Sequence, residues 1–198
     1  ADRQRPARLP LNSPLAFIHV EADERSKGAS KVNPDEARCV AWLVQQVLQT
    51  LPPRLTGDEI GVISPYAAQV AEIRRALPMA ARDGVQVSSV DAFQGCEKDV
   101  IIVSLVRANR RGDVGFVSDW RRLNVALTRA RRLCVIVASM TTWLASDCAL
   151  VREWLGFHAA GDADVRAFRA GALQVLPEEH LARVLKLREE FAQNRPEA

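Results

Sequence analysis

Arginines are the residues in this sequence most able to bind charged ligands, and they are concentrated in one window. Between Arg107 and Arg132 there are eight arginines against two acids, so this window carries a charge of +6. The whole chain carries only +3, which leaves −3 for the remaining residues. This density of guanidinium groups favours phosphates, on a nucleotide or a nucleic acid, although a solvated basic surface has the same composition.

Three short segments beside apolar runs carry the other candidate residues. They are residues 63–66 (ISPY), 88–99 (SSVDAFQGCEKD) and 119–131 (DWRRLNVALTRAR). Hydroxyl groups and backbone amides can take phosphate oxygens without reading a base sequence, and a tyrosine ring can stack on a base or a sugar. The planar arginine fork suits the oxygens of a phosphoryl group. All three segments therefore predict contacts with phosphates.

Apolar runs and helical patterns predict the elements that position these segments. Strands are expected at residues 15–20, 59–64, 85–90, 100–106 and 133–138. Asn33, a proline and two acids form a typical helix start, and helices are expected to about residue 51, over residues 66–77 and from Asp119 to Arg131. Arg122 and Arg129 share one stripe of that last helix, apart from its apolar stripe. Residues 21–32 are polar and predict a loop.

Continuous apolar strands that alternate with helices indicate an α/β fold, with a mostly parallel sheet and helices on both faces. Ligands of such sheets bind at the carboxyl ends of the strands. Here these are the loops after Ile63, Val90, Val106 and Ala138. We divide the chain into a lead-in (residues 1–14), one α/β domain (15–155) and a charged, helical C-terminal extension (156–198).

Composition excludes several other classes of protein. A chain of 198 residues, 48% of them hydrophobic, can bury a core without disulfides and is unlike a disordered protein. No run approaches the roughly 20 apolar residues of a membrane span. The four cysteines are scattered, so we expect no metal site, but reduced thiols in an intracellular protein of the cytoplasm, nucleus or an organelle.

The three polar segments together, in this order, resemble motifs IV, V and VI of superfamily 1 helicases. The resemblance covers about residues 33–154 and is to the up-frameshift-like branch, typified by the nonsense-mediated-decay helicase. A block of a dozen residues followed by RRLNVALTRAR makes the pattern specific. The resemblance implies a P-loop NTPase-type fold, namely the second of two RecA-like domains of an ATP-driven motor, whose partner is the first RecA-like domain of the same protein.

The resemblance also implies which residues touch the nucleotide. Arg129 is similar to the family's arginine finger, which stabilises the γ-phosphate during transfer. Gly95, Glu97 and Gln94 match the nucleotide-binding part of motif V, where Glu97 accepts the ribose hydroxyls. Without the resemblance, Arg129 would be interpreted as a surface arginine and Glu97 as half of a surface ion pair. Gln94 could orient water or phosphate, or simply connect loops.

Nucleic-acid contacts are implied for Ser64, Tyr66 and Ser89. The Tyr66 ring could instead pack on the core where a helix begins. The resemblance also implies supporting residues for motifs V and VI, which are Asp91, Arg122 and Asn124. Arg107 and Asn109 match a neighbouring family element, where we expect a structural salt bridge rather than a ligand contact.

Several parts of a complete motor are not found in this sequence. It has no Gly-x-x-x-x-Gly-Lys-Ser/Thr phosphate loop, and no apolar strand ends in an Asp-Glu pair that could hold magnesium. The family's Gln-Tyr-Arg element, expected before Leu15, is absent as well. The implied cofactor is ATP with Mg²⁺, the metal being held by the first RecA-like domain. We therefore expect this chain alone not to hydrolyse ATP.

The leading hypothesis is an ATP-dependent helicase or translocase on single-stranded RNA or DNA, with no membrane partner. The form of motif V, VDAFQG-x-EKD, favours RNA over DNA. The alternative is a degenerate helicase domain that serves as a non-catalytic scaffold in a ribonucleoprotein complex, although an intact motif VI argues against it. A third possibility is a basic nucleic-acid-binding module that works without a nucleotide.

Overall fold

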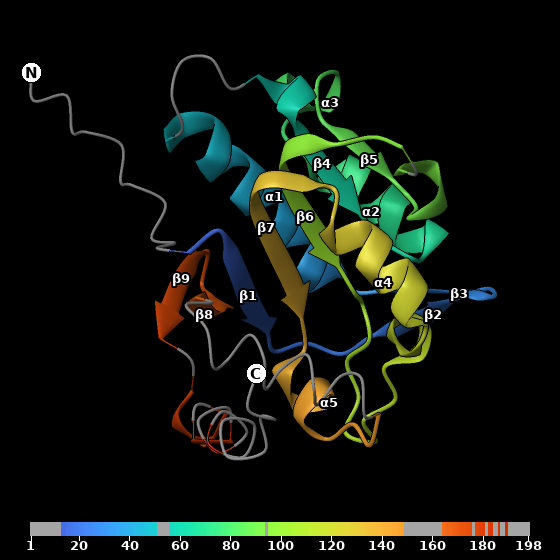
Figure 1. Ribbon diagram of the computed structural model, residues 1–198, viewed down its shortest axis with the longest axis vertical. Helices are drawn as coiled ribbons and strands as arrows, with labels where there is room; N and C mark the ends of the chain where they lie inside the picture. The colour runs from blue at the N-terminus through green and yellow to red at the C-terminus, as the bar shows by residue number, and fades with distance from the viewer. Residues whose placement is uncertain are drawn as a thin grey trace, which may run out of the picture.

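The computed structural model describes residues 13–50, 56–93, 95–148, 164–175 and 177–180, together with residues 182, 183, 186 and 189. Seven strands form one sheet in the order β5-β4-β6-β7-β1-β8-β9 (Figure 1). Their bounds are β1 Leu15–Val20, β4 Ile60–Ile63, β5 Gln86–Ser88, β6 Lys98–Ser104, β7 Ala130–Ala138, β8 Asp164–Arg169 and β9 Ala172–Val175. All neighbouring strands are parallel except β8 and β9. This confirms the expected α/β, RecA-like fold.

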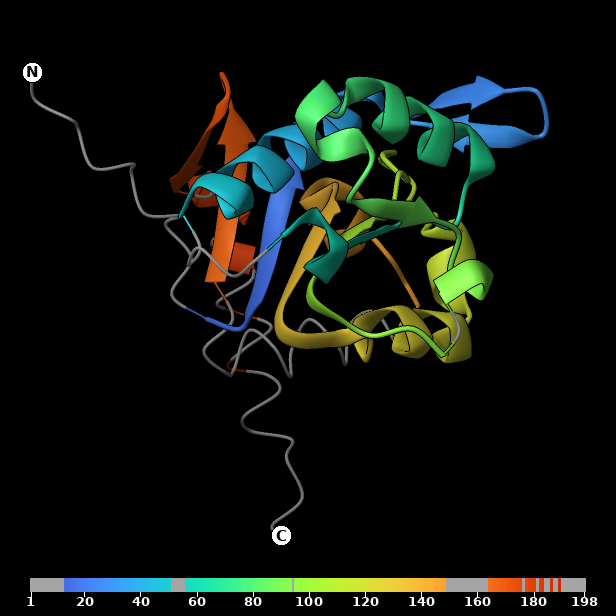
Figure 2. The ribbon, with the colours of Figure 1, turned by 90° about the horizontal axis from the view of Figure 1, so that it is seen from above.

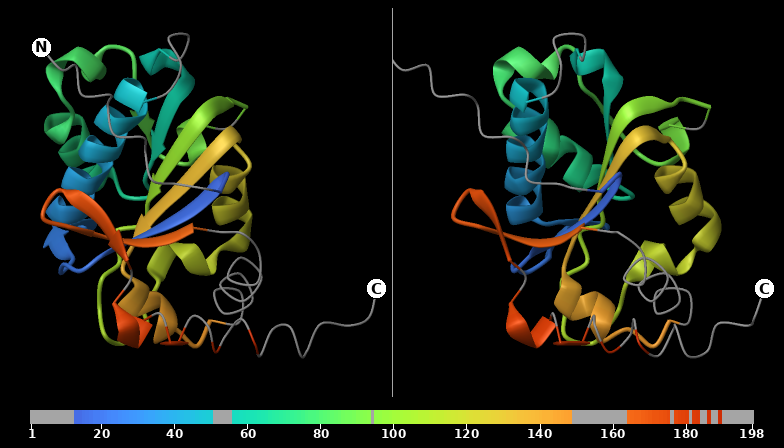
Figure 3. Two further views of the ribbon diagram at one scale, coloured as in Figure 1. Left: turned by 90° about the vertical axis from the view of Figure 1, so that its left-hand side faces the viewer. Right: turned by 60° about the vertical axis from the view of Figure 1, so that its left-hand side comes forward.

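Helices cover both faces of the sheet (Figures 2 and 3). On one face lie α1 (Pro34–Thr50), α2 (Ala67–Ala76) and the short α3 (Met79–Arg82), and on the other lie α4 (Trp120–Leu127) and α5 (Met140–Leu144). Each face has its own apolar core, and β4, β6 and β7 contribute residues to both. The continuous apolar runs seen in the sequence thus reflect strands that are buried on both faces.

The motif V segment, residues 88–99, is fixed by one aromatic side chain on the face of the sheet that α4 and α5 cover. After β5 the chain forms a short 3₁₀ turn, η2 (Asp91–Phe93), before it reaches β6. Phe93 is fully buried there. A Cβ atom on Gly61 of β4 would lie 2.7 Å from the Phe93 ring, so glycine at this position leaves room for the ring. This packing holds the segment between β5 and β6 in place.

Two sequence expectations outside the core are wrong. Residues 21–32 are not a plain loop, because β2 (Arg25–Lys27) and β3 (Ser30–Val32) form an antiparallel hairpin. The helical extension expected over residues 156–198 is wrong for residues 164–175, where β8 pairs in parallel with β1. Neither change has a strong local signal, since the hairpin is polar and arginines interrupt the apolar residues of β8. Both are fixed by distant partners in the chain.

The helix expected from Asp119 to Arg131 ends earlier than the sequence suggests. It begins at its N-cap, Asp119, but α4 stops at Leu127, so Arg129 lies in the turn that follows. Ala130 already pairs with Lys98 in the sheet, which forces the chain out of the helix. The Thr128 hydroxyl donates to a carbonyl of the last helical turn and closes it.

Residues 1–12, 51–55, 149–163 and Gln94 lie outside the described residues. Within the described part, no helix combines the length and apolar character needed to span a bilayer. All four cysteines are free thiols, and Cys39 and Cys134 are buried.

A buried carboxyl group holds the end of β6. Glu36 of α1 is 0% exposed, and its Oε2 accepts hydrogen bonds from the Ser104 hydroxyl (2.7 Å) and the Val106 N–H (2.9 Å). Val106 has φ 70°, and the Arg107 N–H donates to the Leu105 carbonyl (2.8 Å), so a tight turn ends the strand. A left-handed conformation is unfavourable for a branched residue, and the bond to Glu36 helps to hold it.

Burial raises the pKa of Glu36 to about 8, although its two hydrogen bonds pull in the opposite direction. The folded state therefore keeps a proton that the unfolded state releases above about pH 4.5. We expect stability to fall as the pH rises through this window, by up to about 1.4 kcal/mol per pH unit. Glu36→Gln keeps an acceptor oxygen without the titration, so its stability should not show this decline.

Urea unfolding at several pH values between 5 and about 8 measures this difference. Asp83→Asn, at an exposed position, is the control and should keep the wild-type slope. A Glu36→Gln protein whose stability declines with pH as steeply as the wild type would contradict the assignment.

Candidate nucleotide and nucleic-acid sites

The sheet separates the candidate residues into two groups at its opposite edges. We call the edge where Ile60, Lys98 and Ala130 begin their strands the amino edge, and the opposite one the carboxyl edge. Strand β6 has seven residues, so the two edges lie about 20 Å apart. The amino edge carries Gly95, Glu97 and Arg129, and the carboxyl edge carries Ser64, Tyr66 and Ser89. The expectation that ligand-binding loops lie at the carboxyl ends of the strands is therefore wrong for Gly95 and Glu97, which follow β5 in the chain but lie at the amino edge just before β6.

Motifs V and VI meet at the amino edge, and Arg129 lies at their junction. The Lys98 N–H donates to the Arg129 carbonyl (3.0 Å), which joins the two segments directly. The half-buried guanidinium donates to the Val125 carbonyl (3.0 Å) and to the Thr128 hydroxyl (3.2 Å). No carboxylate among the described residues pairs with it. Arg129 is thus a positioned cation whose charge is not neutralised.

Glu97 and Gly95 lie beside it, just before β6. Glu97 faces Arg131 at 3.6 Å in an exposed ion pair, as the surface-pair interpretation expects. Exposed pairs of this kind contribute at most about 1 kcal/mol, so the carboxylate is available to other donors. Gly95 has φ 82°, and no heavy atom lies within 4 Å of the position that a Cβ would take. Its backbone is therefore open to close approach.

These groups fit a nucleoside triphosphate. A fixed arginine can meet a phosphate, an exposed carboxylate can meet the ribose hydroxyls, and an open glycine backbone lets the ligand come close. The described residues contain no cluster of three or more His, Cys, Asp or Glu that could hold a metal ion.

The carboxyl edge contains two accessible candidates and one buried one. Ser64 is 0% exposed, and its hydroxyl has no hydrogen-bond partner, while its N–H pairs with the Ser88 carbonyl (3.2 Å). Its hydroxyl is therefore closed to a nucleic-acid strand in this arrangement. Tyr66 and Ser89 are half-buried. The Tyr66 hydroxyl and the Arg107 guanidinium both lie within 3 Å of the position that a Cβ on Gly115 would take, so the Tyr66 side chain reaches a polar network and does not belong to the core alone.

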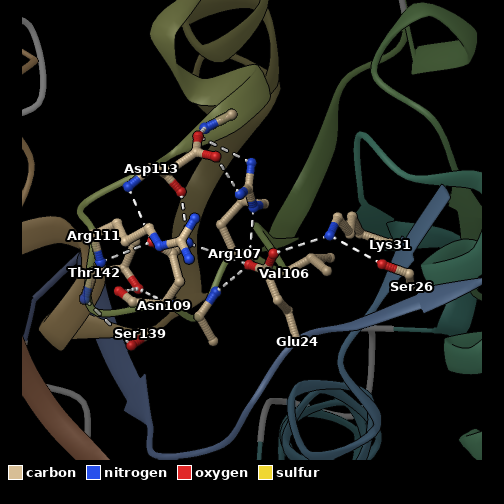
Figure 4. Close-up of polar contacts among 12 residues, drawn as sticks. Glu24, Ser26, Lys31, Val106, Arg107, Asn109, Arg111, Asp113, Ser139 and Thr142 are labelled. Carbon is tan, nitrogen blue, oxygen red and sulfur yellow. Dashed lines mark hydrogen bonds and ion pairs between the residues drawn. The ribbon is translucent and has the colours of Figure 1, made fainter. Parts of the chain in front are cut away.

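That network is built around a buried ion pair (Figure 4). The Arg107 Nε donates to Glu24 (2.8 Å), and its two terminal nitrogens donate to the two oxygens of Asp113 (3.1 and 2.6 Å). The side chains of Arg107 and Glu24 are only 11% and 12% exposed. Glu24 also accepts from the Ala108 N–H and from Asn109. The expected structural salt bridge at Arg107 and Asn109 is confirmed.

The pKa directions follow from these contacts. Burial by itself would raise the pKa of Glu24, but its hydrogen bonds with Arg107, Ala108 and Asn109 outweigh burial, and the pKa is lowered. Hydrogen bonding to Arg107 lowers the pKa of Asp113. Sequence reasoning missed Glu24 altogether, because it precedes Arg107 by 83 residues and no local pattern connects them.

The family is settled by comparison with known proteins. A sequence model described as an AAA domain matches residues 2–141. A DNA polymerase alpha-associated DNA helicase A from Saccharomyces cerevisiae is 38% identical over 146 residues, which cover 73% of this chain and 21% of that protein. This chain belongs to the AAA domain family and is a superfamily 1 helicase domain. Its assignment to the up-frameshift-like branch stays a prediction.

Other relatives of this helicase domain are also long proteins that match it over a short stretch. DNA-binding protein SMUBP-2 from Rattus norvegicus is 39% identical over 122 residues, 62% of this chain and 12% of the relative. Helicase sen1 from Schizosaccharomyces pombe is 37% identical over 136 residues, 66% of this chain and 8% of the relative. The matched part of the chain thus spans about a fifth of these relatives or less.

The predicted supporting residues of the helicase domain lie on the surface. Asp91 is exposed in η2, and Arg122 and Asn124 are exposed on α4. Arg122 lies 3.6 Å from Asp119 of its own helix. The buried residues of α4 are Leu123 and Ala126, so apolar packing attaches this helix to the sheet.

The Arg107–Glu24 pair should dominate the stability of the carboxyl edge. Arg107→Met removes the donor of several hydrogen bonds to Glu24 and Asp113 and leaves Glu24 with only the Lys31 ammonium (3.3 Å) as a cation, so we expect a loss of about 1–3 kcal/mol in the free energy of unfolding. Arg132→Ala is the matched control, because Arg132 is 75% exposed and pairs with Asp99 at 3.1 Å. It should cost at most about 1 kcal/mol. Equal losses in urea unfolding would refute the assigned role of the buried pair.

Proposed function

We propose that this helicase domain is the second motor domain of an ATP-dependent helicase or translocase that acts on single-stranded nucleic acid, with RNA preferred over DNA. The proposal rests on the position and charge of Arg129. It is held by the end of α4 at the junction of motifs V and VI, and no described carboxylate neutralises it. An arginine finger must keep its charge for an incoming phosphate while its side chain is held in place, and Arg129 meets both conditions within the described part of the chain.

The amino edge forms one side of the nucleotide site in this proposal. ATP with Mg²⁺ supplies the γ-phosphoryl group that is transferred to water, and the first RecA-like domain holds the metal. Arg129 offsets the negative charge that spreads over the phosphoryl oxygens during transfer. Glu97 exchanges its weak pair with Arg131 for the ribose hydroxyls, and Gly95 lets the backbone come close to the nucleotide. Gln94, which precedes Gly95 in the sequence, orients water or phosphate.

The carboxyl edge holds the strand. Tyr66 offers a ring for stacking on a base or sugar, and Ser89 offers a hydroxyl for a phosphate oxygen. Ser64 contributes through its N–H, which joins β4 to β5 beneath them. Asp91, Arg122 and Asn124 support motifs V and VI from their surface.

The preference for RNA is supported by the form of motif V. Two of the relatives carry DNA in their names, so DNA is tested beside RNA. The competing function is a degenerate helicase domain that acts as a scaffold in a ribonucleoprotein complex. The positioned, unneutralised Arg129 favours the motor, since a scaffold has no use for a charge held in this way.

ATP hydrolysis tests the role of Arg129 as an arginine finger, in a protein where this chain is joined to a first RecA-like domain. Arg129→Ala should lower strand-stimulated ATP hydrolysis roughly 10³-fold or more, because no arginine then offsets the negative charge that spreads over the phosphoryl oxygens during transfer. Affinity for the strand without nucleotide should be unchanged. Arg132→Ala, an exposed arginine at the same edge, is the control and should hydrolyse ATP like the wild type. This chain alone should not hydrolyse ATP.

The scaffold alternative has its own outcome in the same assay. If the well-folded wild type hydrolyses no ATP with RNA or with DNA, the motor proposal is wrong and the scaffold replaces it. If Arg129→Ala hydrolyses ATP at the wild-type rate, the motor stands but the finger lies elsewhere.

A further inference from the structure

Two neighbouring arginines are exposed on a loop at the carboxyl edge. We call residues 107–115, which connect β6 to the 3₁₀ turn η3 (Gly115–Ser118), the Arg110–Arg111 loop. Arg110 and Arg111 are both exposed, and neither pairs with a carboxylate among the described residues. Asp113, the acid within the loop, is already paired with Arg107. The loop therefore presents two positive charges that no described carboxylate neutralises.

Asn109 fixes this loop from the inside (Figure 4). Its Oδ1 accepts from the N–H groups of Arg111 (3.2 Å) and Asp113 (3.0 Å), and its Nδ2 donates to the Asp113 carbonyl (2.8 Å). Its own backbone is bound on both sides by the Thr142 hydroxyl of α5 (2.7 and 2.8 Å). One side chain thus closes the loop around Arg110 and Arg111 and anchors it to the next helix.

The two ends of the loop are fixed as well. Arg107 and Asp113 form a two-pronged ion pair across its base, and the Gly115 N–H donates to Asp113 (2.9 Å). Gly112 has φ 70° and packs closely on the Ala145 carbonyl at the end of α5. The loop backbone is therefore already ordered before any ligand arrives. A preordered site binds more tightly, because the ligand does not have to supply the entropy of ordering.

The loop lies next to the candidate strand-binding residues. Arg107, at its start, reaches the end of the loop, where its Nη1 would lie 2.3 Å from a Cβ on Gly115. The same Cβ would lie 2.7 Å from the Tyr66 hydroxyl. Tyr66 and the Arg110–Arg111 loop are thus parts of one connected surface at the carboxyl edge.

We propose that Arg110 and Arg111 bind consecutive backbone phosphates of the single strand, beside the base or sugar that meets Tyr66. The inference rests on the proposed function and adds a site to it. Two exposed guanidinium forks on a fixed loop suit phosphates, and they read no base sequence. The strand is favoured over an acidic protein partner because the same surface offers an aromatic ring, which a nucleic acid can use for stacking.

Salt-dependent binding tests the site. Fluorescence anisotropy of labelled oligouridylate and oligothymidylate measures the affinity of this chain, joined to a first RecA-like domain, from about 50 to 200 mM salt. Loss of two phosphate contacts in Arg110→Ala/Arg111→Ala should lower the slope of log K against log salt by about 1.4, since each contact contributes about 0.7. Affinity at about 0.1 M salt should fall roughly 10- to 30-fold, and equally for RNA and DNA.

Two further variants separate position from charge. Arg38→Ala/Arg75→Ala removes two exposed arginines from the face covered by α1 and α2, so it should keep the wild-type slope. Asn109→Ala keeps both charges but releases the loop, so affinity should fall while the slope stays near that of the wild type.

The outcomes separate the phosphate site from the proposed function. If the wild type binds a strand and the Arg110–Arg111 variant matches the Arg38–Arg75 control, the phosphate site is wrong while the proposed function stands. If the loss is confined to RNA or to DNA, a backbone contact is contradicted. If the wild type binds neither strand at any salt concentration, the proposed function fails together with the site.

Discussion

The pairing of Lys98 with Ala130, where β6 and β7 begin side by side, is the constraint on which the arrangement of this domain depends. Because the strands are parallel, the residues just before both of them meet at one edge, and the residues just after them meet at the other. Gly95, Glu97 and Arg129 therefore gather at the amino edge. The loops that follow β4, β5 and β6 gather about 20 Å away at the carboxyl edge. One sheet thus presents two chemically different surfaces.

The carboxyl edge is assembled from parts of the chain that are far apart. Glu24 comes before α1, Arg107 follows β6, and Thr142 belongs to α5, yet they form one hydrogen-bonded network. A buried ion pair stabilises a fold only when its remaining donors and acceptors are also satisfied. Here the Ala108 N–H, Asn109 and Asp113 satisfy them. The same network orders the loop that carries Arg110 and Arg111, so stability and ligand binding depend on the same contacts.

Local patterns predicted the core elements well and the contacts between distant segments poorly. The run LAFIHV matches β1 residue for residue, and the Asn33 cap starts α1, because both signals are contained within a few neighbouring residues. The order of motifs IV to VI identified Arg129 and Glu97 as candidates, but not the edge on which they lie. The end of α4, the hairpin, β8, the burial of Ser64 and the partner of Arg107 all depend on pairing across the sheet. No short stretch of sequence encodes such pairing.

Hydrogen exchange of the domain, joined to a first RecA-like domain, tests the division into two edges most directly. A single strand should protect backbone amides near Tyr66, near Ser89 and in residues 107–115. A non-hydrolysable ATP analogue should protect residues 95–98 and 128–131 instead. When no strand is present, the analogue should leave the amides near Tyr66, near Ser89 and in residues 107–115 little changed. The account is contradicted if the strand protects the amino edge, or if the analogue alone protects residues 107–115.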